Sequence, residues 1–436
     1  MSTTTINQNA ILEKLNIKSL NKMQNQTFNS IITNLNTVLL SPTGTGKTLG
    51  FLLPVISSLN LDLQEVQALI IVPSRELALQ IDQVIRSMGS GIKSNAVYGG
   101  RAFSKDKIEI KHLPAILVGT PGRIADHLRK NTFSTENLKT LILDEFDKSL
   151  EVGFENEMKE IIALLPDLEK KILTSATQKI EVPSFVGLQD PIVINFLDEG
   201  ESQLEVKTVI SPTKDKRETL LELLNNLGNQ PGIIFCNFKD TIQDVSDYLA
   251  DNYVSHGCFY GGMEQKDRER ALIKFRNGTH QILIATDLAA RGIDVPEIKF
   301  IIHYELPHRS EEFTHRNGRT ARMNADGTAY VLKWKEERLR DFIISSEIEE
   351  LTPKKTTLKS NWETIFISGG RKDKISKGDI AGIFMKQGNL TKDELGIIEI
   401  KQDCAFVAVV ATKASQIVNQ FDNTRMKKKK VRVNLV

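Results

Sequence analysis

The stretch LLSPTGTGKT, residues 39–48, places an apolar run directly before a glycine-rich loop. A helical pattern, TLGFLLPVIS, follows at residues 48–57, so the loop joins a strand to the start of a helix. Backbone N–H groups of such a loop can surround phosphate oxygens, helped by the positive end of the helix dipole. A chance glycine-rich turn would explain the composition but not this position between strand and helix. The stretch therefore predicts a phosphate loop in an α/β nucleotide-binding domain.

Individual residues of the loop have predictable tasks. Lys47 is expected to reach the β- and γ-phosphates, and Thr48 is expected to hold Mg²⁺. The strict pattern has Gly where this chain has Ser41. The predicted nucleotide-binding residues of the loop are Thr43, Gly44, Thr45, Gly46, Lys47 and Thr48.

A second stretch, LILDEFDKSL at residues 141–150, ends an apolar run in three acids. A solvated turn is the commoner reason for such a cluster. In a phosphate-loop enzyme, however, an acid at the end of a neighbouring strand supports Mg²⁺, which suits Asp144. Glu145 would then polarise the attacking water as general base. We interpret both acids, with Lys47, as catalytic residues, and Asp144 and Thr48 as the metal-binding residues.

Short apolar runs alternate with helical patterns along most of the chain. The runs between residues 37 and 177 are continuous rather than alternating, which is typical of buried parallel strands. A similar series fills residues 232–334, so a second α/β layer is expected. The predicted fold class is α/β, with two tandem parallel-sheet domains and a small α+β domain. The predicted boundaries are 1–200, 206–348, a linker at 349–360, and 361–436.

The composition is ordinary for a globular protein, with 40% hydrophobic and 26% charged residues. The formal net charge of the 436 residues is only +2, but residues 361–436 carry fourteen Lys/Arg against eight Asp/Glu. Cys236, Cys258 and Cys404 lie far apart, which favours reduced thiols and a cytoplasmic protein. The N-terminal residues lack the features of a signal peptide, and no apolar run approaches the roughly 18 residues of a membrane span.

An ordered series of motifs resembles the DEAD-box RNA helicases of superfamily 2 over about residues 10–340. The first half contains SPTGTGKT (41–48), PSRELALQ (73–80), YGG (98–100), TPGR (120–123), DEFD (144–147) and SAT (175–177). The second half contains IIFCN (233–237), QKDR (265–268), TDLAARGID (286–294) and HRNGRTAR (315–322). The resemblance implies two RecA-like domains that face each other across a cleft, with ATP between them and RNA lying across both.

The resemblance also implies roles for single residues. Gln24, Gly292 and Asp294 would contact the nucleotide. Arg319 and Arg322 would neutralise the transferring phosphoryl group, and their spacing would place them on one side of a helix. Asp147, Ser175, Thr177 and His315 would couple ATP to domain closure. The implied RNA-binding residues are Arg75, Gly99, Gly100, Thr120, Arg123, Arg268 and Thr286.

Two positions depart from the family pattern. Phe146 replaces the usual Ala of the DEAD motif, although both flanking acids are present. The adenine-binding segment around Gln24 has Leu20 and Lys22 in place of prolines, and no aromatic residue precedes it near residue 7. The preference for ATP over GTP is therefore not determined by the sequence.

Residues 361–436 resemble the C-terminal RNA-binding domain of the DbpA subgroup, a variant RRM. The match centres on residues 364–384 and 404–410. Arg371, Lys372 and Lys374 follow a predicted strand and are expected to bind RNA phosphates. Phe366 could face the sheet surface or the core, and the core is the commoner case. The lysine run 427–430 is either a second basic patch or a solvated tail.

The predicted function is that of an RNA-dependent ATPase that locally unwinds structured RNA, with ATP and Mg²⁺ as cofactors. The resemblance of the tail suggests a ribosomal RNA hairpin as partner and large-subunit assembly as the process. Three alternatives remain open at this point: an ATP-gated RNA clamp, a DNA helicase, and a general messenger-RNA helicase without ribosomal targeting.

Overall fold

The computed structural model describes residues 7–42, 44–151, 153–176, 182–197, 204–287, 298–320, 327–344, 347–353 and 358–436. Among these residues the chain divides into two compact units, one formed by residues 7–197 and the other by residues 204–436. Within the described residues no helix is long and apolar enough to cross a membrane.

The first unit is built on a parallel sheet with strand order β3-β4-β2-β5-β6-β1-β7, counted over its described residues. Its strands are β1 (Asn36–Leu40), β2 (Ala68–Ile71), β3 (Ser94–Val97), β4 (Ile116–Gly119), β5 (Thr140–Leu143), β6 (Lys170–Ser175) and β7 (Ile192–Asn195). Its helices are α1 (Gln8–Lys14), α2 (Lys22–Thr33), α3 (Lys47–Ser58), α4 (Arg75–Met88), α5 (Phe103–Glu109), α6 (Pro121–Arg129), α7 (Phe146–Glu151), α8 (Glu155–Ala163) and the 3₁₀ turn η1 (Ser184–Val186).

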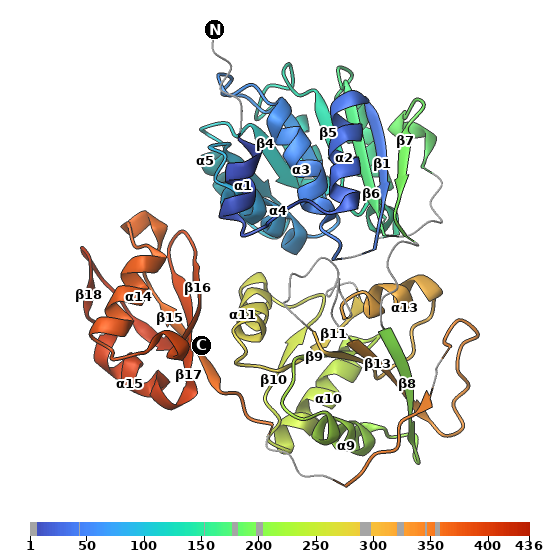
Figure 1. The fold of residues 1–436 in the computed structure, drawn as a ribbon, viewed down its shortest axis with the longest axis vertical. Coiled ribbons are helices and arrows are strands. Elements are labelled where there is room, and N and C mark those ends of the chain that lie inside the picture. Colours follow the sequence, from blue (N-terminus) through green and yellow to red (C-terminus); the bar gives the residue numbers. More distant parts are fainter. Residues whose placement is uncertain are drawn as a thin grey trace. The chain divides into compact units, whose positions relative to one another are not determined.

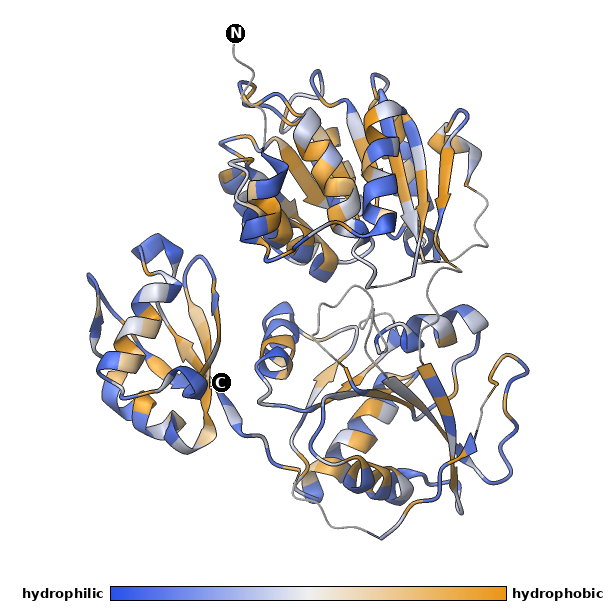
Figure 2. Ribbon diagram, in the orientation of Figure 1, coloured by the Kyte–Doolittle hydropathy of each residue, from blue (hydrophilic) through white to orange (hydrophobic). Residues whose placement is uncertain are grey.

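Both faces of this sheet are covered, which explains the continuous apolar runs in the sequence. Ile70 and Ile142 pack into the core on one face, whereas Leu69 and Leu141 pack into the core on the other. Figure 2 shows the consequence, because hydrophobic colouring predominates on the strands of this sheet. Parallel strands place their carboxyl ends at one edge, and the loops that follow β1 and β5 meet there.

The second unit repeats this plan in a parallel sheet of order β10-β11-β9-β12-β13-β8-β14 over its described residues. Its strands are β8 (Leu204–Ser211), β9 (Gly232–Phe235), β10 (His256–Phe259), β11 (Ile282–Ala285), β12 (Phe300–His303), β13 (Gly327–Trp334) and β14 (Glu347–Ile348). The helices described in this part are α9 (Arg217–Leu227), α10 (Lys239–Asp251), α11 (Gln265–Arg276) and α13 (Ser310–Asn317) (Figure 1).

A small α+β domain completes the second unit. Its antiparallel sheet has the order β16-β17-β15-β20. The strands are β15 (Trp362–Ile367), β16 (Leu395–Ile400), β17 (Ala405–Val410) and β20 (Val433–Leu435), and the helices are α14 (Lys377–Lys386) and α15 (Ala411–Phe421). The 3₁₀ turns η2 (Arg371–Asp373) and η3 (Lys392–Glu394) and the hairpin β18 (Arg425–Met426)–β19 (Lys429–Lys430) complete the domain.

The predicted fold class is confirmed: two parallel seven-stranded sheets with helices precede a small antiparallel sheet with helices, over the described residues. Two alternatives that the sequence left open are decided, and one finer expectation needs correction. The lysine run is part of the β18–β19 hairpin and not a solvated tail. Phe366 faces away from the domain core, because its neighbours Ile365 and Ile367 fill that core. Arg319 lies beyond α13, which ends at Asn317, so it is not on a helix.

Candidate functional site

The phosphate loop links β1 to α3 and has the backbone that a phosphate needs. Gly44 and Gly46 both have φ of +85°, a conformation that glycine adopts without a steric penalty. Gly46 caps the N-terminus of α3, so the first N–H groups of this twelve-residue helix point toward the loop. Ser41, which replaces the expected glycine, is fully buried, and its hydroxyl lies 2.8 Å from that of Thr45. The serine therefore fits by bonding within the loop.

Lys47 lies inside this loop. Its Nζ donates hydrogen bonds to the carbonyl oxygens of Ser41 (2.6 Å) and Pro42 (2.8 Å). Burial lowers the pKa of Lys47 to about 8, although the charges of Asp144 and Glu145 raise it in part. Because β1 and β5 both pair in parallel with β6, the end of β5 lies near the phosphate loop.

The acids after β5 are buried and held in place. Asp144 is 3% exposed and accepts a hydrogen bond from the hydroxyl of Thr174 on β6. Glu145 has φ of +48°, a strained conformation for a residue with a side chain. Its N–H donates to Asp144 Oδ1 and Thr174 Oγ1, both at 3.2 Å, while its carboxylate lies 2.9 Å from the Nζ of the fully buried Lys148. A strained backbone conformation at a single residue is typical of functional sites.

Burial and the neighbouring charge of Glu145 raise the pKa of Asp144 to about 6. Burial likewise raises the pKa of Asp147, whose carboxylate accepts a hydrogen bond from the side chain of Ser175. A divalent cation bound by oxygen ligands would favour the ionised form of these acids. Two adjacent carboxylates and the hydroxyl of Thr48 are hard oxygen ligands of the kind that Mg²⁺ prefers, so these residues fit that ion.

Gln24 contacts the phosphate loop directly. It is 7% exposed, and its Nε2 donates to the carbonyl oxygen of Gly46 at 3.2 Å. Asn21 caps α2 and donates from Nδ2 to the carbonyl oxygen of Thr45 at 3.1 Å. The start of α2 is thus attached to the phosphate loop through both side chains. The nucleotide contact of Gln24 stays a prediction. Asn21 was not predicted, although its position three residues before Gln24 is a capping-box signal.

Several predicted RNA-binding residues of the first unit lie close together. The guanidinium of Arg75, at the start of α4, covers Gly100, where an added Cβ would lie 2.4 Å from Nη1. Thr120 caps α6. Arg123 donates from Nη1 to the buried carboxylate of Asp106 at 2.6 Å and from Nη2 to the carbonyl oxygen of Arg101, also at 2.6 Å. The predicted RNA contact of Arg123 stays a prediction, and the structure adds a contact to a buried acid.

In the second unit, Arg268 lies on α11 with its guanidinium 4.7 Å from the centre of the Phe259 ring. The N–H of Thr286, just after β11, donates to the carbonyl oxygen of Phe259 at 3.3 Å. These contacts place both predicted RNA-binding residues beside the end of β10. His315 is buried on α13, and Arg319 is buried just after that helix.

Arg316 was missed by the sequence reasoning, although it stands inside the HRNGRTAR motif. It is 1% exposed, and its guanidinium donates two hydrogen bonds of 2.6 Å to the carboxylate of Asp287. It also donates to Asn237 Oδ1 and to the carbonyl oxygen of Glu305, both at 2.7 Å. Arg316 therefore joins the three segments that contain Asp287, Asn237 and Glu305, which follow strands of the second sheet.

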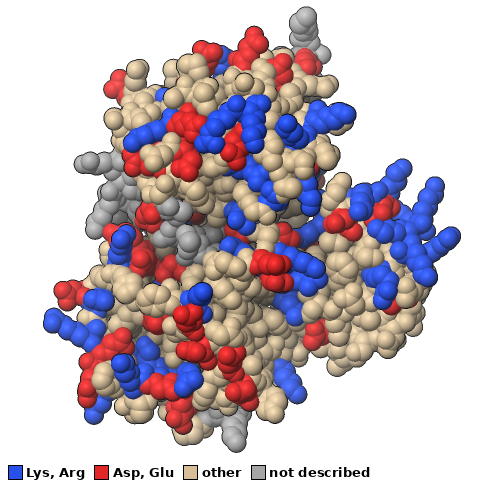
Figure 3. Space-filling view, turned by 180° about the vertical axis from the view of Figure 1, so that it is seen from behind, with Lys and Arg blue, Asp and Glu red and all other residues tan. Residues whose placement is uncertain are grey.

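The small domain presents exposed cations. Arg371, Lys372 and Lys374 are exposed at η2, and Lys374 has φ of +59°. The Nζ of Lys427 donates to the carbonyl oxygen of Lys374 at 2.8 Å, so the lysine-rich hairpin adjoins this turn. Figure 3 shows Lys and Arg gathered on the domain, which is the lobe at the right of that view. Electrostatic binding of phosphates is the expected property of such a surface.

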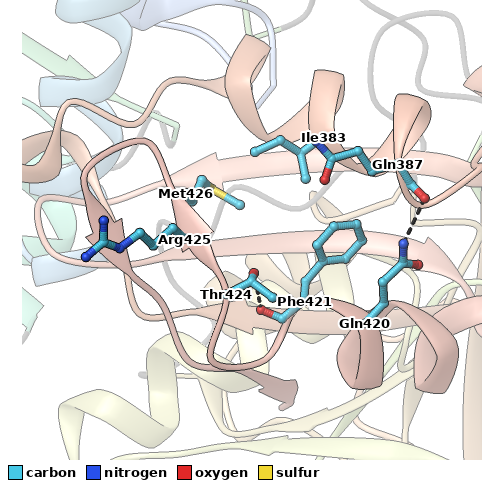
Figure 4. A pocket seen from close by; sticks show the side chains of 7 residues that line it. All are labelled: Ile383, Gln387, Gln420, Phe421, Thr424, Arg425 and Met426. Atoms are coloured by element: carbon cyan, nitrogen blue, oxygen red, sulfur yellow. Dashed lines mark hydrogen bonds between the residues drawn. The ribbon is translucent and has the colours of Figure 1, made fainter.

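Five predicted site residues lie outside the described residues: Thr43, Thr177, Gly292, Asp294 and Arg322. A pocket of about 200 Å³ in the small domain is lined by residues of α14, α15 and β18 and contains no predicted site residue. Figure 4 shows that Gln420 and Thr424 already donate hydrogen bonds there, to the carbonyl oxygens of Gln387 (2.8 Å) and Phe421 (2.7 Å). This pocket lies in another domain than the phosphate loop, and none of the loop's residues lines it.

A phosphate loop with two buried acids beside it, on a parallel sheet that recurs in a second unit, defines a nucleoside-triphosphatase of the two-sheet helicase class. Comparison with known families agrees over most of the chain. Residues 21–185 match the DEAD/DEAH box helicase family, residues 215–324 the helicase conserved C-terminal domain, and residues 364–435 the DbpA RNA binding domain.

Two bacterial relatives match over nearly the whole chain. The ATP-dependent RNA helicase DbpA of Bacillus subtilis (strain 168) is 33% identical, with 97% of this chain and 96% of the relative covered. The protein of the same name from Escherichia coli (strain K12) is 31% identical, with 98% and 96% covered. The chain belongs to the DEAD-box ATP-dependent RNA helicases of the DbpA type; it binds ATP, and it binds RNA through the small domain.

Solved structures show the same helicase fold. S. cerevisiae Dbp5 bound to RNA and ADP BeF3 is 24% identical, with a TM-score of 0.67 over 75% of this chain and 88% of that chain. The DEAD-box helicase Mss116 bound to ssRNA and UDP-BeF has a TM-score of 0.71 over 80% and 79%, at 24% identity.

Proposed function

We propose that this RNA helicase hydrolyses ATP with Mg²⁺ at the phosphate loop and remodels ribosomal RNA during large-subunit assembly. The observation that carries the catalytic part is the buried pair Asp144–Glu145, which influences the charge of Lys47 in the loop. No solvated turn would bury two acids and a lysine together, because desolvation of each charge is costly without a function or a partner.

In this proposal each residue has one task in phosphoryl transfer. The loop N–H groups and Lys47 bind the phosphates, and Thr48 and Asp144 would hold Mg²⁺, which supplies charge neutralisation when bound. Glu145 accepts the proton of the attacking water, and its strained backbone and Thr174 fix its direction. Arg319 and Arg322 neutralise the transferred phosphoryl group, with Gly292 and Asp294 as further nucleotide contacts. Asp147, Ser175, Thr177 and His315 couple these events to closure.

For RNA we propose backbone recognition without base reading in the helicase domains. Glycine N–H groups, threonine hydroxyls and arginines are suited to phosphate and sugar oxygens, which position a strand without reading its sequence. The contact between Arg75 and Gly100 supports this, because it places a cation beside a loop that has no side chain to block a phosphate. The residues concerned are Arg75, Gly99, Gly100, Thr120, Arg123, Arg268 and Thr286.

The small domain would select the RNA. Its match to the DbpA RNA binding domain and its exposed Arg371, Lys372 and Lys374 support a structured RNA target, for which a ribosomal hairpin is our proposal. The bacterial relatives and the free cysteines support a cytoplasmic location.

Steady-state ATPase of the full chain tests the proposal at one fixed salt concentration, because phosphate binding depends on salt. The stimulants are large-subunit ribosomal RNA, poly(U) and single-stranded DNA. Stimulation by ribosomal RNA well above the others, lost on deletion of residues 361–436, is the expected result. Equal stimulation by every RNA would refute ribosomal targeting, and equal stimulation by DNA would refute RNA selectivity.

A further inference from the structure

The sheet of the small domain has a core face and an outer face. Ile365 and Ile367 belong to the core, so the alternating residues of β15 point to the outer face. Thr364, Phe406 and Ala408 share that outer face, yet they are only 1%, 5% and 2% exposed. A sheet face open to solvent would not bury a threonine hydroxyl. Other parts of the second unit must therefore cover it.

The covering segment is the end of α11 with the turn that follows. Asn277 donates from Nδ2 to Thr364 Oγ1 at 3.1 Å, and the Thr279 hydroxyl lies 2.7 Å from the same oxygen. Asn277 and Thr279 are each 5% exposed. The buried polar atoms of Thr364 are thus satisfied by the parallel-sheet domain, as buried polar groups require.

Two ion pairs flank this contact. Arg276 Nη2 lies 2.8 Å from Glu399 Oε2, and Lys401 Nζ lies 2.5 Å from Glu269 Oε2. Lys401 also lies 5.8 Å from the centre of the Phe406 ring, so it covers the outer face directly. Each pair joins one residue of α11 to one residue of β16 or its end. Each side carries an acid followed by a base, and each acid pairs with the base of the other side.

The chain that enters the small domain is attached to the same region. Ser360 Oγ donates to the carbonyl oxygen of Gly278, and Asn229 Nδ2 donates to the carbonyl oxygen of Lys359 at 2.8 Å. Trp362 lies against Gly278, because a Cβ added there would be in ordinary van der Waals contact with its Cδ1, at 3.4 Å. Gly278 has φ of +74°, which also favours glycine at this point.

We propose that the outer face of the small domain's sheet is a docking surface for the second helicase domain, with α11 as the strut between them. The proposal deepens the proposed function and rests on its RNA-binding residues. Arg268 and Arg276 are eight residues apart on α11, which corresponds to about 12 Å of helix. The docked strut fixes the separation between RNA held by the small domain and RNA held near Arg268.

Docking also restricts where the small domain binds RNA. Phe366 and Phe406 contact each other edge to face at 5.6 Å, and Phe406 is buried. An RRM-like sheet commonly stacks bases on aromatic residues of its open face. Here the strut occupies part of that face, so the exposed cations at η2 remain as the RNA surface.

A charge-neutral swap tests the docking. The double variant Glu269→Lys, Arg276→Glu reverses both charges of the strut, and Glu399→Arg, Lys401→Glu reverses both on the small domain. Combination of all four restores opposite charges. Trp362 reports docking in a Trp334→Phe background, because the chain has only two tryptophans. We expect red-shifted and more acrylamide-quenched emission in each double variant, with recovery in the quadruple variant.

The matched control is Lys413→Glu, which breaks an ion pair of 2.7 Å and similar exposure inside the small domain. It is expected to leave Trp362 emission unchanged. Emission that is identical in the wild type and both double variants overturns docking. A shift in the double variants that the quadruple variant does not reverse overturns the assignment to these ion pairs.

ATPase measurements test the strut. Ribosomal RNA should reach half-maximal stimulation at concentrations roughly three- to tenfold higher in each double variant, with kcat unchanged and the quadruple variant restored. With poly(U) the half-saturating concentration should not change. If the emission changes but the half-saturating concentration of ribosomal RNA does not, the proposed role of α11 in fixing the separation of the two RNA-binding regions is overturned. If the wild type does not respond to ribosomal RNA above poly(U), ribosomal targeting fails, while the emission result still decides docking.

Discussion

Glu145 combines a strained backbone with a buried carboxylate, and the chemical role proposed for it depends on that carboxylate's charge. Glu145→Gln keeps the size of the side chain and the backbone bonds to Thr174 and Asp144. We expect kcat for ATP to fall about 10²- to 10⁴-fold, because general-base catalysis contributes that much, while RNA binding is retained. Steady-state ATPase at saturating RNA is the measurement. Glu155→Gln, at an exposed position of α8, is the control. A kcat of Glu145→Gln equal to that of the wild type would remove Glu145 from the base role.

Asp106 lies at the centre of the most strongly paired cluster of the first unit. It is fully buried, and its carboxylate contacts Arg101 at 2.5 Å, Arg123 at 2.6 Å and the ring of His127 at 3.4 Å. Burial alone would raise the pKa of Asp106, but these contacts outweigh burial and lower it, with His127 the largest favourable contribution.

Asp106→Asn should therefore destabilise the first unit by about 3 kcal/mol, since removing one partner leaves buried charge uncompensated. Urea unfolding followed by circular dichroism measures the loss. Asp126→Asn breaks an exposed pair with Arg129 and should cost less than about 1 kcal/mol. Equal losses in the two variants would mean that the cluster contributes no more than a surface ion pair.

At the scale of the element, adjacent strands β5 and β6 hold the catalytic acids. Thr174 of β6 is fully buried, and its hydroxyl donates to Asp144 while it accepts the N–H of Glu145. Thr174→Val keeps the shape and removes both bonds. We expect kcat to fall about tenfold with little change in the RNA concentration for half-saturation.

Thr174→Ser keeps the hydroxyl and should recover most of the lost kcat. If Thr174 had only a structural role, both variants would lower the free energy of unfolding by similar amounts, and Thr174→Ser would not recover kcat. Steady-state ATPase and urea unfolding of the two variants separate these results.

The strands and the phosphate loop could be predicted because each is determined locally. Continuous apolar runs such as that ending at Leu143 have a single explanation in a sheet covered on both faces. Thr174, Arg316 and Asp106 could not be assigned, because they bind partners 17 to 30 residues away along the chain, and only the folded chain shows them. The face on which Phe366 lies was left open, because alternation gives two faces but not which one is the core.

At the scale of the whole molecule, the two units should respond differently to acid. Burial lowers the pKa of His303 to about 3 and of His280 to about 4, and it also lowers that of His256. All three lie in the second unit. In the first unit, by contrast, the pKa values of Asp144 and Asp147 are raised, so protonation of these acids favours the folded state.

The sign follows from proton linkage. As pH falls below about 6.5, the unfolded second unit binds protons that the folded unit excludes, so its stability falls with pH. Between pH 7 and 5.5, His280 and His303 together should lower the free energy of unfolding of the second unit by about 2 kcal/mol. The first unit should not lose stability through Asp144 and Asp147, because their pKa values are raised. Both tryptophans lie in the second unit, so their fluorescence follows it alone, and circular dichroism follows the whole chain.

Urea unfolding at pH 7 and 5.5 measures this difference. The fluorescence midpoint should fall with pH, and His303→Phe, placed between the rings of Phe235 and Phe313, should reduce the fall by about half. That variant loses the hydrogen bond to Asn317, which changes its midpoint at pH 7. The test is therefore how much the midpoint changes between the two pH values. A fluorescence midpoint independent of pH would show that the buried histidines do not control the acid stability of the second unit.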